Sequence, residues 1–169
     1  YLFGTDALGR DMLSRMIYGS QISLIVGIST VLLQGVLGVL IGLLSGYFGG
    51  WVDNILMRIA DIQQSIPFLI LAVALAAVVR PSLINIIFVL GITGWVTYSR
   101  VVRGQVLSIR EREFVEASRA LGSGNARIIF KHILPNIVPS ITVIATLTIS
   151  TMILAEASLS FLGMGVPPP

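Results

Sequence analysis

Four stretches of the sequence carry no charged side chain, and short polar segments separate them. They cover residues 16–52, 62–79, 81–99 and 132–155, with the one histidine counted as neutral. A helix needs about 20 apolar residues to cross roughly 30 Å of hydrocarbon, and it satisfies its own backbone hydrogen bonds on the way. The pattern therefore predicts an all-α fold, a polytopic transmembrane helical bundle with crossings at about residues 22–47, 67–79, 83–99 and 137–159.

Small residues recur inside the first of these stretches. Gly38, Gly42 and Gly46 lie four residues apart, and Gly50 continues the series. Because residues four apart share one face of a helix, a second helix can approach this face closely. The spacing predicts tight packing here, against a helix of this chain or of another. The pair Gly49–Gly50 is expected to end the helix, and residues 51–65 to form a semi-polar loop or a short helix.

The first 20 residues mix charged and apolar side chains. Met12, Met16 and Ile17 share one helical face, whereas the charged residues lie mostly elsewhere. This arrangement is typical of an amphipathic helix that lies at a membrane surface. A surface loop is the alternative.

Charge is scarce and is concentrated in one segment. Charged residues make up 11% of the chain, against about 25% in soluble proteins. Residues 100–131 hold seven Arg or Lys and three Glu, or +4, and the remaining residues sum to −1. With four crossings, residues 47–66 and 100–136 share one side and hold eight of the 11 basic residues. The positive-inside rule places that side in the cytoplasm, and in this membrane setting it explains the basic patch better than nucleic-acid binding does.

The basic segment contains a predicted helix, a glycine and a second helix. Residues 109–121 are expected to be helical, with a weakly apolar face, and Gly122 is expected to end that helix with a positive φ. Ser123 or Asn125 can cap the second helix, which is expected to end near Pro135. The apolar face consists of Phe114, Ala117, Ser118 and Leu121. The unit is either a docking element for a cytoplasmic partner or a simple amphipathic connector.

Other residues offer little chemistry. Glu156 is the only acid deep in an apolar run, and an ionisable residue there is a functional candidate. We expect it to pack at an outer gate, with substrate contact or no special role as alternatives. His132 is expected to make a hydrogen bond at a helix end rather than to bind a metal. The chain has no cysteine, no Gly-x-x-x-x-Gly-Lys-Ser/Thr motif and no plausible catalytic triad. We therefore expect no catalysis and no bound cofactor.

Three motifs resemble one known family. Glu116-Ala117-Ser118, Gly122 and His132-Ile133-Leu134-Pro135 are similar to the cytoplasmic "EAA" loop of the membrane subunits of binding-protein-dependent ABC importers. The form His-Ile-Leu-Pro-Asn resembles that of the dipeptide, oligopeptide and nickel branch, although the broad pattern has Ala where Ser118 stands and Ile where His132 stands. Residues 4–11 with Ser14-Arg15 resemble the extracytoplasmic motif of this branch, and residues 156–163 resemble its signature near the penultimate crossing.

The resemblance implies a fold, partners and site residues. It implies the type I ABC importer permease fold, with residues 1–169 as a four-crossing fragment of a six-crossing subunit in a bacterial or archaeal cell membrane. Residues 100–135 would be the coupling-helix loop, which docks on an ATPase subunit. The implied partners are a second, different permease subunit, two ATPases that bind the ATP, and an extracytoplasmic solute-binding protein. The implied ATPase-docking residues are Glu116, Ala117, Ser118, Gly122, Leu134 and Pro135.

Two other classes of protein are alternatives. A secondary transporter driven by an ion gradient usually places charges or broken helices near the membrane midplane, where only Glu156 qualifies weakly. A purely structural membrane scaffold is the second alternative. The resemblance leaves the substrate open among dipeptides, longer peptides, nickel complexes and glutathione-like compounds.

Overall fold

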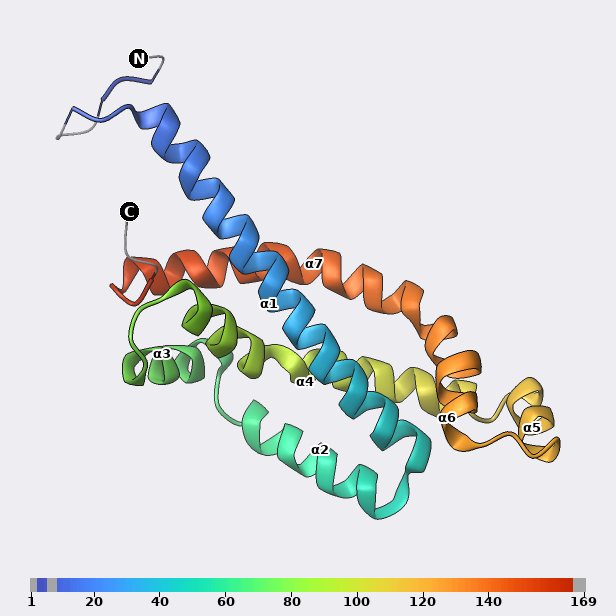
Figure 1. Cartoon of the computed structure of the whole chain (residues 1–169). Coiled ribbons are helices and arrows are strands. Elements are labelled where there is room, and N and C mark those ends of the chain that lie inside the picture. Colours follow the sequence, from blue (N-terminus) through green and yellow to red (C-terminus); the bar gives the residue numbers. More distant parts are fainter. Residues whose placement is uncertain (1–2, 6–8, 166–169) are drawn as a thin grey trace.

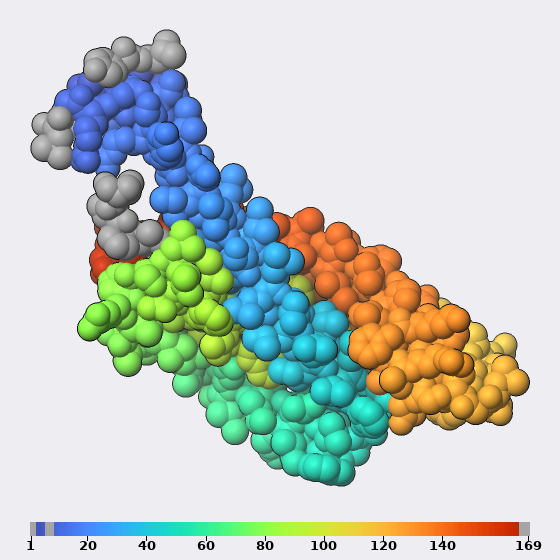
Figure 2. Space-filling view, in the orientation of Figure 1, coloured from blue at the N-terminus to red at the C-terminus, as the bar shows by residue number. Residues whose placement is uncertain are grey.

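The computed structural model describes residues 3–5 and 9–165, and helices dominate this part of the chain. Figures 1 and 2 show an elongated molecule in which α1 runs diagonally across the other long helices. The segment around α5 and α6 forms one end, and the start of α1 and the end of α7 point toward the other. In chain order the elements are α1 (Met12–Phe48), α2 (Gly50–Gln64), α3 (Phe68–Val78), α4 (Leu83–Ile109), α5 (Glu113–Ala120), α6 (Asn125–Arg127), the π-helix η1 (Ile128–Ile133) and α7 (Leu134–Phe161).

The first crossing begins earlier than predicted. Asp11 caps α1, because its carboxylate accepts hydrogen bonds from the backbone N–H of Ser14 (3.1 Å) and from its hydroxyl (2.6 Å). These bonds, the hydroxyl bond first, lower the pKa of Asp11 below its ordinary value. From Met12 the helix continues without a break to Phe48. The prediction of a separate surface helix within residues 1–20 is therefore wrong, since Met12, Met16 and Ile17 belong to the first crossing. Residues 6–8 of the first motif lie outside the described residues.

The glycine series of α1 packs against α4, as its spacing predicts. A Cβ atom added at Gly38 would lie 2.6 Å from the carbonyl oxygen of Trp95, and one at Gly42 would lie 2.7 Å from that of Ser99. One at Gly46 would lie 2.8 Å from the Cβ of Val106. These separations are too short for real atoms, so the backbones approach as closely as they do only because glycine has no side chain. The partner helix belongs to this chain.

The second crossing is broken rather than continuous. Helix α2 continues through the range predicted as a loop or short helix, and α3 begins just after Pro67, which cannot extend a helix that precedes it. The two helices meet at an angle of 82°. Three helical segments, residues 12–48, 83–109 and 125–161, are long and apolar enough to cross a membrane, and the bent pair α2–α3 is a fourth candidate span. The prediction of a single crossing at residues 67–79 missed this bend, because α3 alone has 11 residues.

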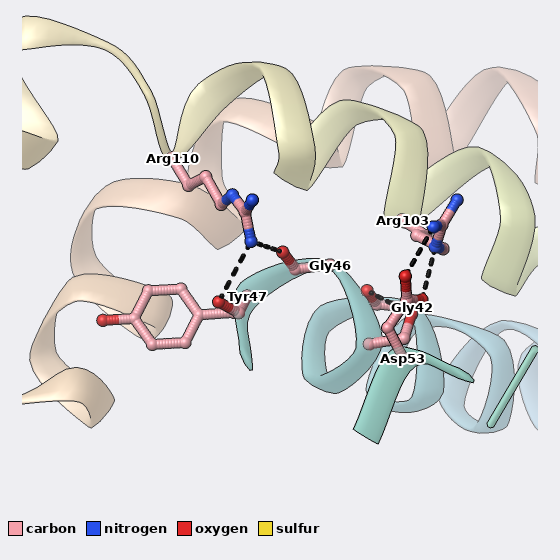
Figure 3. A network of polar contacts seen from close by, with 7 residues as sticks. Gly42, Gly46, Tyr47, Asp53, Arg103 and Arg110 are labelled. Atoms are coloured by element: carbon pink, nitrogen blue, oxygen red, sulfur yellow. Dashed lines mark hydrogen bonds and ion pairs between the residues drawn. The ribbon is translucent and has the colours of Figure 1, made fainter. Parts of the chain in front are cut away.

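Ion pairs join the polar faces of α2 and α4. Arg103 donates from Nε and Nη2 to the two carboxylate oxygens of Asp53, both at 2.5 Å (Figure 3). Arg100 donates to Asp61 at 2.6 Å, although this pair is about half exposed. Helix α4 reaches these partners because it extends ten residues beyond the predicted end of the third crossing at Ser99. The guanidinium of Arg110 donates to the carbonyl oxygen of Gly46 at 2.9 Å, which places a positive charge at the C-terminal end of α1 (Figure 3).

The second helix of the loop does not end near Pro135. Residues 125–161 form one helical segment, in which η1 contributes a π turn just before the proline. The backbone N–H of Leu134 donates to the carbonyl of Ile129, five residues back, and Pro135 follows in the first turn of α7. A proline costs little at this point because its missing N–H comes where the hydrogen-bond register changes. The side chain of Asn136 donates to the carbonyl of His132 at 2.6 Å.

Buried apolar side chains form two main clusters. One joins α1, α3, α4 and α7 in the half of the bundle nearer the chain ends, and it includes Val26, Leu90 and Leu159. The other joins the last turns of α1 and α4 to α5, η1 and the start of α7. The second cluster fixes the loop of residues 100–135 on the bundle, so the loop is part of the packed structure.

Candidate functional site: the basic loop and the cavity

Gly122 makes the turn between the two helical parts of the loop. It has a φ of +77°, which side-chain-bearing residues rarely adopt. Its N–H donates to the carbonyl of Arg119, and the N–H of Ser123 donates to the carbonyl of Ser118. These two bonds form the Schellman arrangement that satisfies the end of a helix. The predicted role of Gly122 as the residue after the helix is confirmed. Helix α5 is shorter than the predicted range of 109–121, because α4 continues to Ile109 and residues 110–112 form a turn.

The inner face of α5 is fixed by polar and apolar contacts. Val115 and Ser118 are buried, and the Ser118 hydroxyl lies 3.3 Å from Nε2 of His132 on η1. The imidazole ring also lies against the ring of Phe114, with centroids 6.4 Å apart. The histidine therefore bridges the two helical parts of the loop, a contact that the sequence did not predict. Asn125, at the start of α6, accepts a hydrogen bond of 2.9 Å from the hydroxyl of Tyr47 at the end of α1.

The outer face of α5 points away from the bundle. Glu116 and Ala117 are exposed, and Leu121 is 87% exposed. The predicted apolar face is therefore divided, since Ser118 packs inward while Ala117 and Leu121 face outward. Beside Glu116 lies a polar hollow of about 280 Å³, and it is lined by Tyr47, Arg110, Glu111, Glu116 and Arg119. An exposed leucine next to acidic and basic side chains is the kind of surface on which another protein can dock.

The remaining predicted loop residues lie at the foot of α7. Leu134 is half-buried and packs against the second cluster, whereas Pro135 is exposed. The structure thus brings Leu134 close to the core that holds α5, but it leaves Pro135 on the surface. Glu116, Ala117 and Pro135 are exposed, whereas Ser118 is buried and Leu134 is half-buried.

Glu156 lies at the opposite end of the bundle from the loop. Its side chain is 6% exposed, and its carboxylate accepts hydrogen bonds from Ser23 on α1 (3.1 Å) and from Ser160 one turn later on α7 (2.7 Å). The residue therefore links α1 to the end of α7. This buried, hydrogen-bonded carboxylate is a packing contact between two crossings, because moving the helices apart would leave it without its α1 partner. Its place at an outer gate stays a prediction.

A mainly apolar cavity that also holds polar side chains lies where the junction of α2 and α3 meets α4 and α7. Its volume is about 710 Å³, and among the described residues no charged side chain lines it. Gln63 shapes one wall: its amide nitrogen donates to the carbonyls of Ile92 (3.0 Å) and Thr93 (2.9 Å), and its oxygen accepts from the indole of Trp95 (2.8 Å). Gln34 donates to the carbonyl of Leu90 at 2.9 Å. Sequence reasoning missed these two glutamines, although a glutamine within a charge-free stretch is a signal that could have been used.

The fold and the loop define a polytopic membrane protein with an ordered basic loop. The sequence model of one protein family, the binding-protein-dependent transport system inner membrane component, matches residues 38–169. The chain belongs to this family. The chain is 47% identical over 167 residues to the oligopeptide transport system permease protein OppC of Bacillus subtilis and 46% identical to the dipeptide transport system permease protein DppC of the same organism. These alignments cover 99% of this chain and 55% and 52% of the two relatives, so the chain spans about half of their length.

A solved structure has the same architecture. The fold matches an inward-facing structure of the MetNI methionine ABC transporter with a TM-score of 0.79 and 26% identity, over 92% of this chain and 77% of the other. The di/tripeptide transport system permease protein DppC of Pseudomonas aeruginosa is a further relative, with 43% identity over the full chain and 56% of its own length. The similarity to the family of membrane components and to the peptide branch is thus confirmed. Nothing in these comparisons supports the ion-gradient alternative.

Proposed function

We propose that this chain is part of the permease subunit of an ATP-driven importer of peptides or a related small solute. It would form part of the translocation pathway in a bacterial or archaeal cell membrane, and it would carry out no catalysis itself. Membership of the family supports the transport role, and relatives named as oligopeptide and dipeptide permeases support the substrate class. The proposed partners are a second permease subunit, two ATPase subunits and an extracytoplasmic solute-binding protein.

The loop of residues 100–135 is the proposed contact with the ATPase. The single observation that carries this proposal is the construction of α5, which is fixed from behind by the second cluster and presents Glu116 and Leu121 outward. Because the loop is packed against the ends of α1, α4 and α7, a displacement of α5 would be passed to all three helices. Closure of two ATPases could then switch the pathway between inward-facing and outward-facing states by rigid-body movement.

The test is a pair of substitutions in the reconstituted transporter. Glu116→Lys reverses an exposed charge, and Gly122→Pro demands a φ near −65° where the chain has +77°. We expect either change to abolish peptide uptake while the protein still inserts in the membrane and assembles with the second permease. Uptake and membrane content are measured in the same preparations.

A matched control separates docking from general charge effects. Glu113→Lys makes the same charge change in the first turn of the same helix, and we expect it to keep most of the uptake. Normal uptake by Glu116→Lys or by Gly122→Pro would refute the docking role. Equal loss in Glu113→Lys and Glu116→Lys would show that net charge, rather than a specific contact of Glu116, controls the activity.

A further inference from the structure

We infer that the cavity between the α2–α3 junction, α4 and α7 is a binding site for the N–H groups of a short peptide, above all its terminal ammonium group, and that hydroxyl oxygens on α7 accept these hydrogen bonds. This inference rests on the proposed function and specifies the chemistry of the ligand within the pathway. It concerns a part of the molecule distant from the coupling loop, since the cavity lies between the α2–α3 junction and the middle of α4 and α7.

The size and charge of the cavity limit what it can bind. A volume of about 710 Å³ lies within the range of roughly 300–1,000 Å³ that is usual for small-molecule sites. Glutamine, threonine and serine side chains alternate with apolar ones such as Phe68 and Leu154 along its walls. Since no lining residue is charged, the site offers no cation to a carboxylate or phosphate group. An anionic ligand that depends on an ion pair for recognition is therefore disfavoured, whereas an ammonium group can be held by neutral hydrogen-bond acceptors.

The hydroxyl groups of α7 face the cavity as hydrogen-bond acceptors. Each serine or threonine hydroxyl has one proton to donate and two lone pairs to accept with. Thr148 donates its proton to the carbonyl of Ile144 at 2.7 Å, and Thr151 donates to that of Thr148 at 2.8 Å. Ser158 donates to the carbonyl of Leu154 at 2.8 Å. While their protons are engaged inside the helix, these oxygens offer lone pairs to the cavity, so a donor is the partner that leaves the helix bonds intact.

The other walls hold two kinds of polar side chain: some already make hydrogen bonds within the protein, and two others are exposed. Both ends of the Gln63 amide bind α4, and the Thr93 hydroxyl donates to the carbonyls of Val89 and Leu90. Gln64 and Thr97 line the same cavity and are exposed. Their amide and hydroxyl protons can reach a ligand carbonyl. A ligand that donates toward α7 and accepts from the opposite wall has the chemistry of a peptide backbone.

Spacing on α7 keeps the acceptors on one face. Thr148, Thr151, Ala155 and Ser158 follow the three-or-four-residue interval of a helix face, and all four line the cavity. Thr146 lies on the same helix and makes the same kind of self-bond, to the carbonyls of Thr142 and Val143, but it does not line the cavity. It is therefore a matched control for every test made at Thr151.

Cysteine protection is the experiment, because the natural chain contains no cysteine. Thr151→Cys and Thr146→Cys are each placed in the assembled, nucleotide-free permease–ATPase complex, with other reactive cysteines removed and without the binding protein. A membrane-impermeant maleimide then labels the new thiol in the presence of trialanine or of N-acetyl-trialanine. We expect trialanine to slow labelling of Cys at position 151 severalfold, N-acetyl-trialanine to protect less, and neither to protect position 146.

Three results would overturn the inference. They are no labelling at position 151, labelling that trialanine does not slow, and equal protection by the two peptides. A second variant tests the acceptor role itself: Thr151→Val keeps the shape and removes the oxygen, and we expect it to weaken trialanine protection of a cysteine at Ser158 severalfold. Unchanged protection in that variant would also contradict the inference.

The outcome is separable from that of the proposed function. Stimulation of ATP hydrolysis by loaded binding protein, and its loss in Glu116→Lys, tests the coupling loop alone. If coupling holds in the Thr151→Cys complex but the cysteine is not protected, only the cavity assignment fails. If loaded binding protein never stimulates ATP hydrolysis in the unmodified complex, the proposed function itself fails.

Discussion

The α1–α4 contact and the loop of residues 100–135 both depend on glycine, but for different physical reasons. At Gly38 the helical backbone is ordinary, and a Cβ atom would collide with the backbone of α4. At Gly122 the space is empty, since nothing lies within 4 Å of an added Cβ, but the φ of +77° excludes most side chains. A side chain is therefore excluded at Gly38 by lack of space and at Gly122 by the backbone conformation.

The difference teaches where each region can tolerate movement. The α1–α4 contact has no free space, so the two helices are expected to move as one body. The loop is exposed on its outer face and packs into the second cluster on its inner face, and hydrogen bonds at Ser118, Arg119 and Asn125 hold its turn. In the proposed function, a displacement of the loop of residues 100–135 would be transmitted to the rigid pair α1 and α4.

Gly38→Ala should have the largest effect on stability. The added methyl group would meet the carbonyl oxygen of Trp95, a backbone atom that cannot rotate away, and overpacking of this kind costs about 1–3 kcal/mol or more. We expect a lower thermal midpoint in detergent. Gly104→Ala is the control, because that position in α4 is helical and open. It should be neutral or stabilise by up to about 1 kcal/mol. Equal behaviour of the two variants would contradict the steric account.

Gly122→Ala should have a smaller and local effect. The left-handed conformation costs an alanine about 1–2 kcal/mol, and no clash adds to this cost. We expect faster amide hydrogen exchange in α5, reduced uptake and an unchanged thermal midpoint of the bundle. Gly124→Ala is the control, since Gly124 has an ordinary φ of −68° and is also open. A matching loss in Gly124→Ala would show that the loop requires flexibility rather than the particular turn at Gly122.

Two aspartates on α2 should give the smallest effects, and unequal ones. Asp53 makes two bonds with Arg103 and its side chain is 14% exposed, whereas Asp61 makes one bond with Arg100 and is 56% exposed. Asp53→Asn should destabilise by about 1 kcal/mol after allowance for partial exposure, and Asp61→Asn by less than about 0.5 kcal/mol. Chemical denaturation in detergent measures both. An equal or reversed order would mean that the forked geometry of Arg103 adds nothing.

The sequence predicted features that depend on neighbouring residues. The charge-free stretches predicted the long apolar helices, the four-residue glycine interval predicted a close helix contact, and the position of Gly122 predicted the turn. Each of these follows from a local rule. The sequence did not predict which helix packs on the glycines, because this contact brings together residues near 40 and residues near 100.

The features that were missed arise from tertiary structure or from competing local rules. Gln63 lies at the start of a charge-free stretch, which marks it as a candidate, but only the fold shows that it holds α4 through three hydrogen bonds. Pro135 was expected to end a helix, but the π turn before it absorbs the missing N–H. His132 was expected to bond near a helix end, and the contact of its ring with Ser118 depends on how two short helices fold together.

The π turn of η1 also changes the directions in which the side chains of the following helix point. A π turn holds about one residue more than an α turn, so side chains after Ile133 are offset by roughly 100° from the directions that an unbroken α-helix would give them. His132 points toward α5 and Thr148 points toward the cavity. The π turn between these two parts of one helical segment adds an extra rotation to the angle between their side chains. The same polypeptide segment therefore contacts α5 near one end and lines the cavity farther along, and the extra residue of the π turn sets the rotation between these two parts.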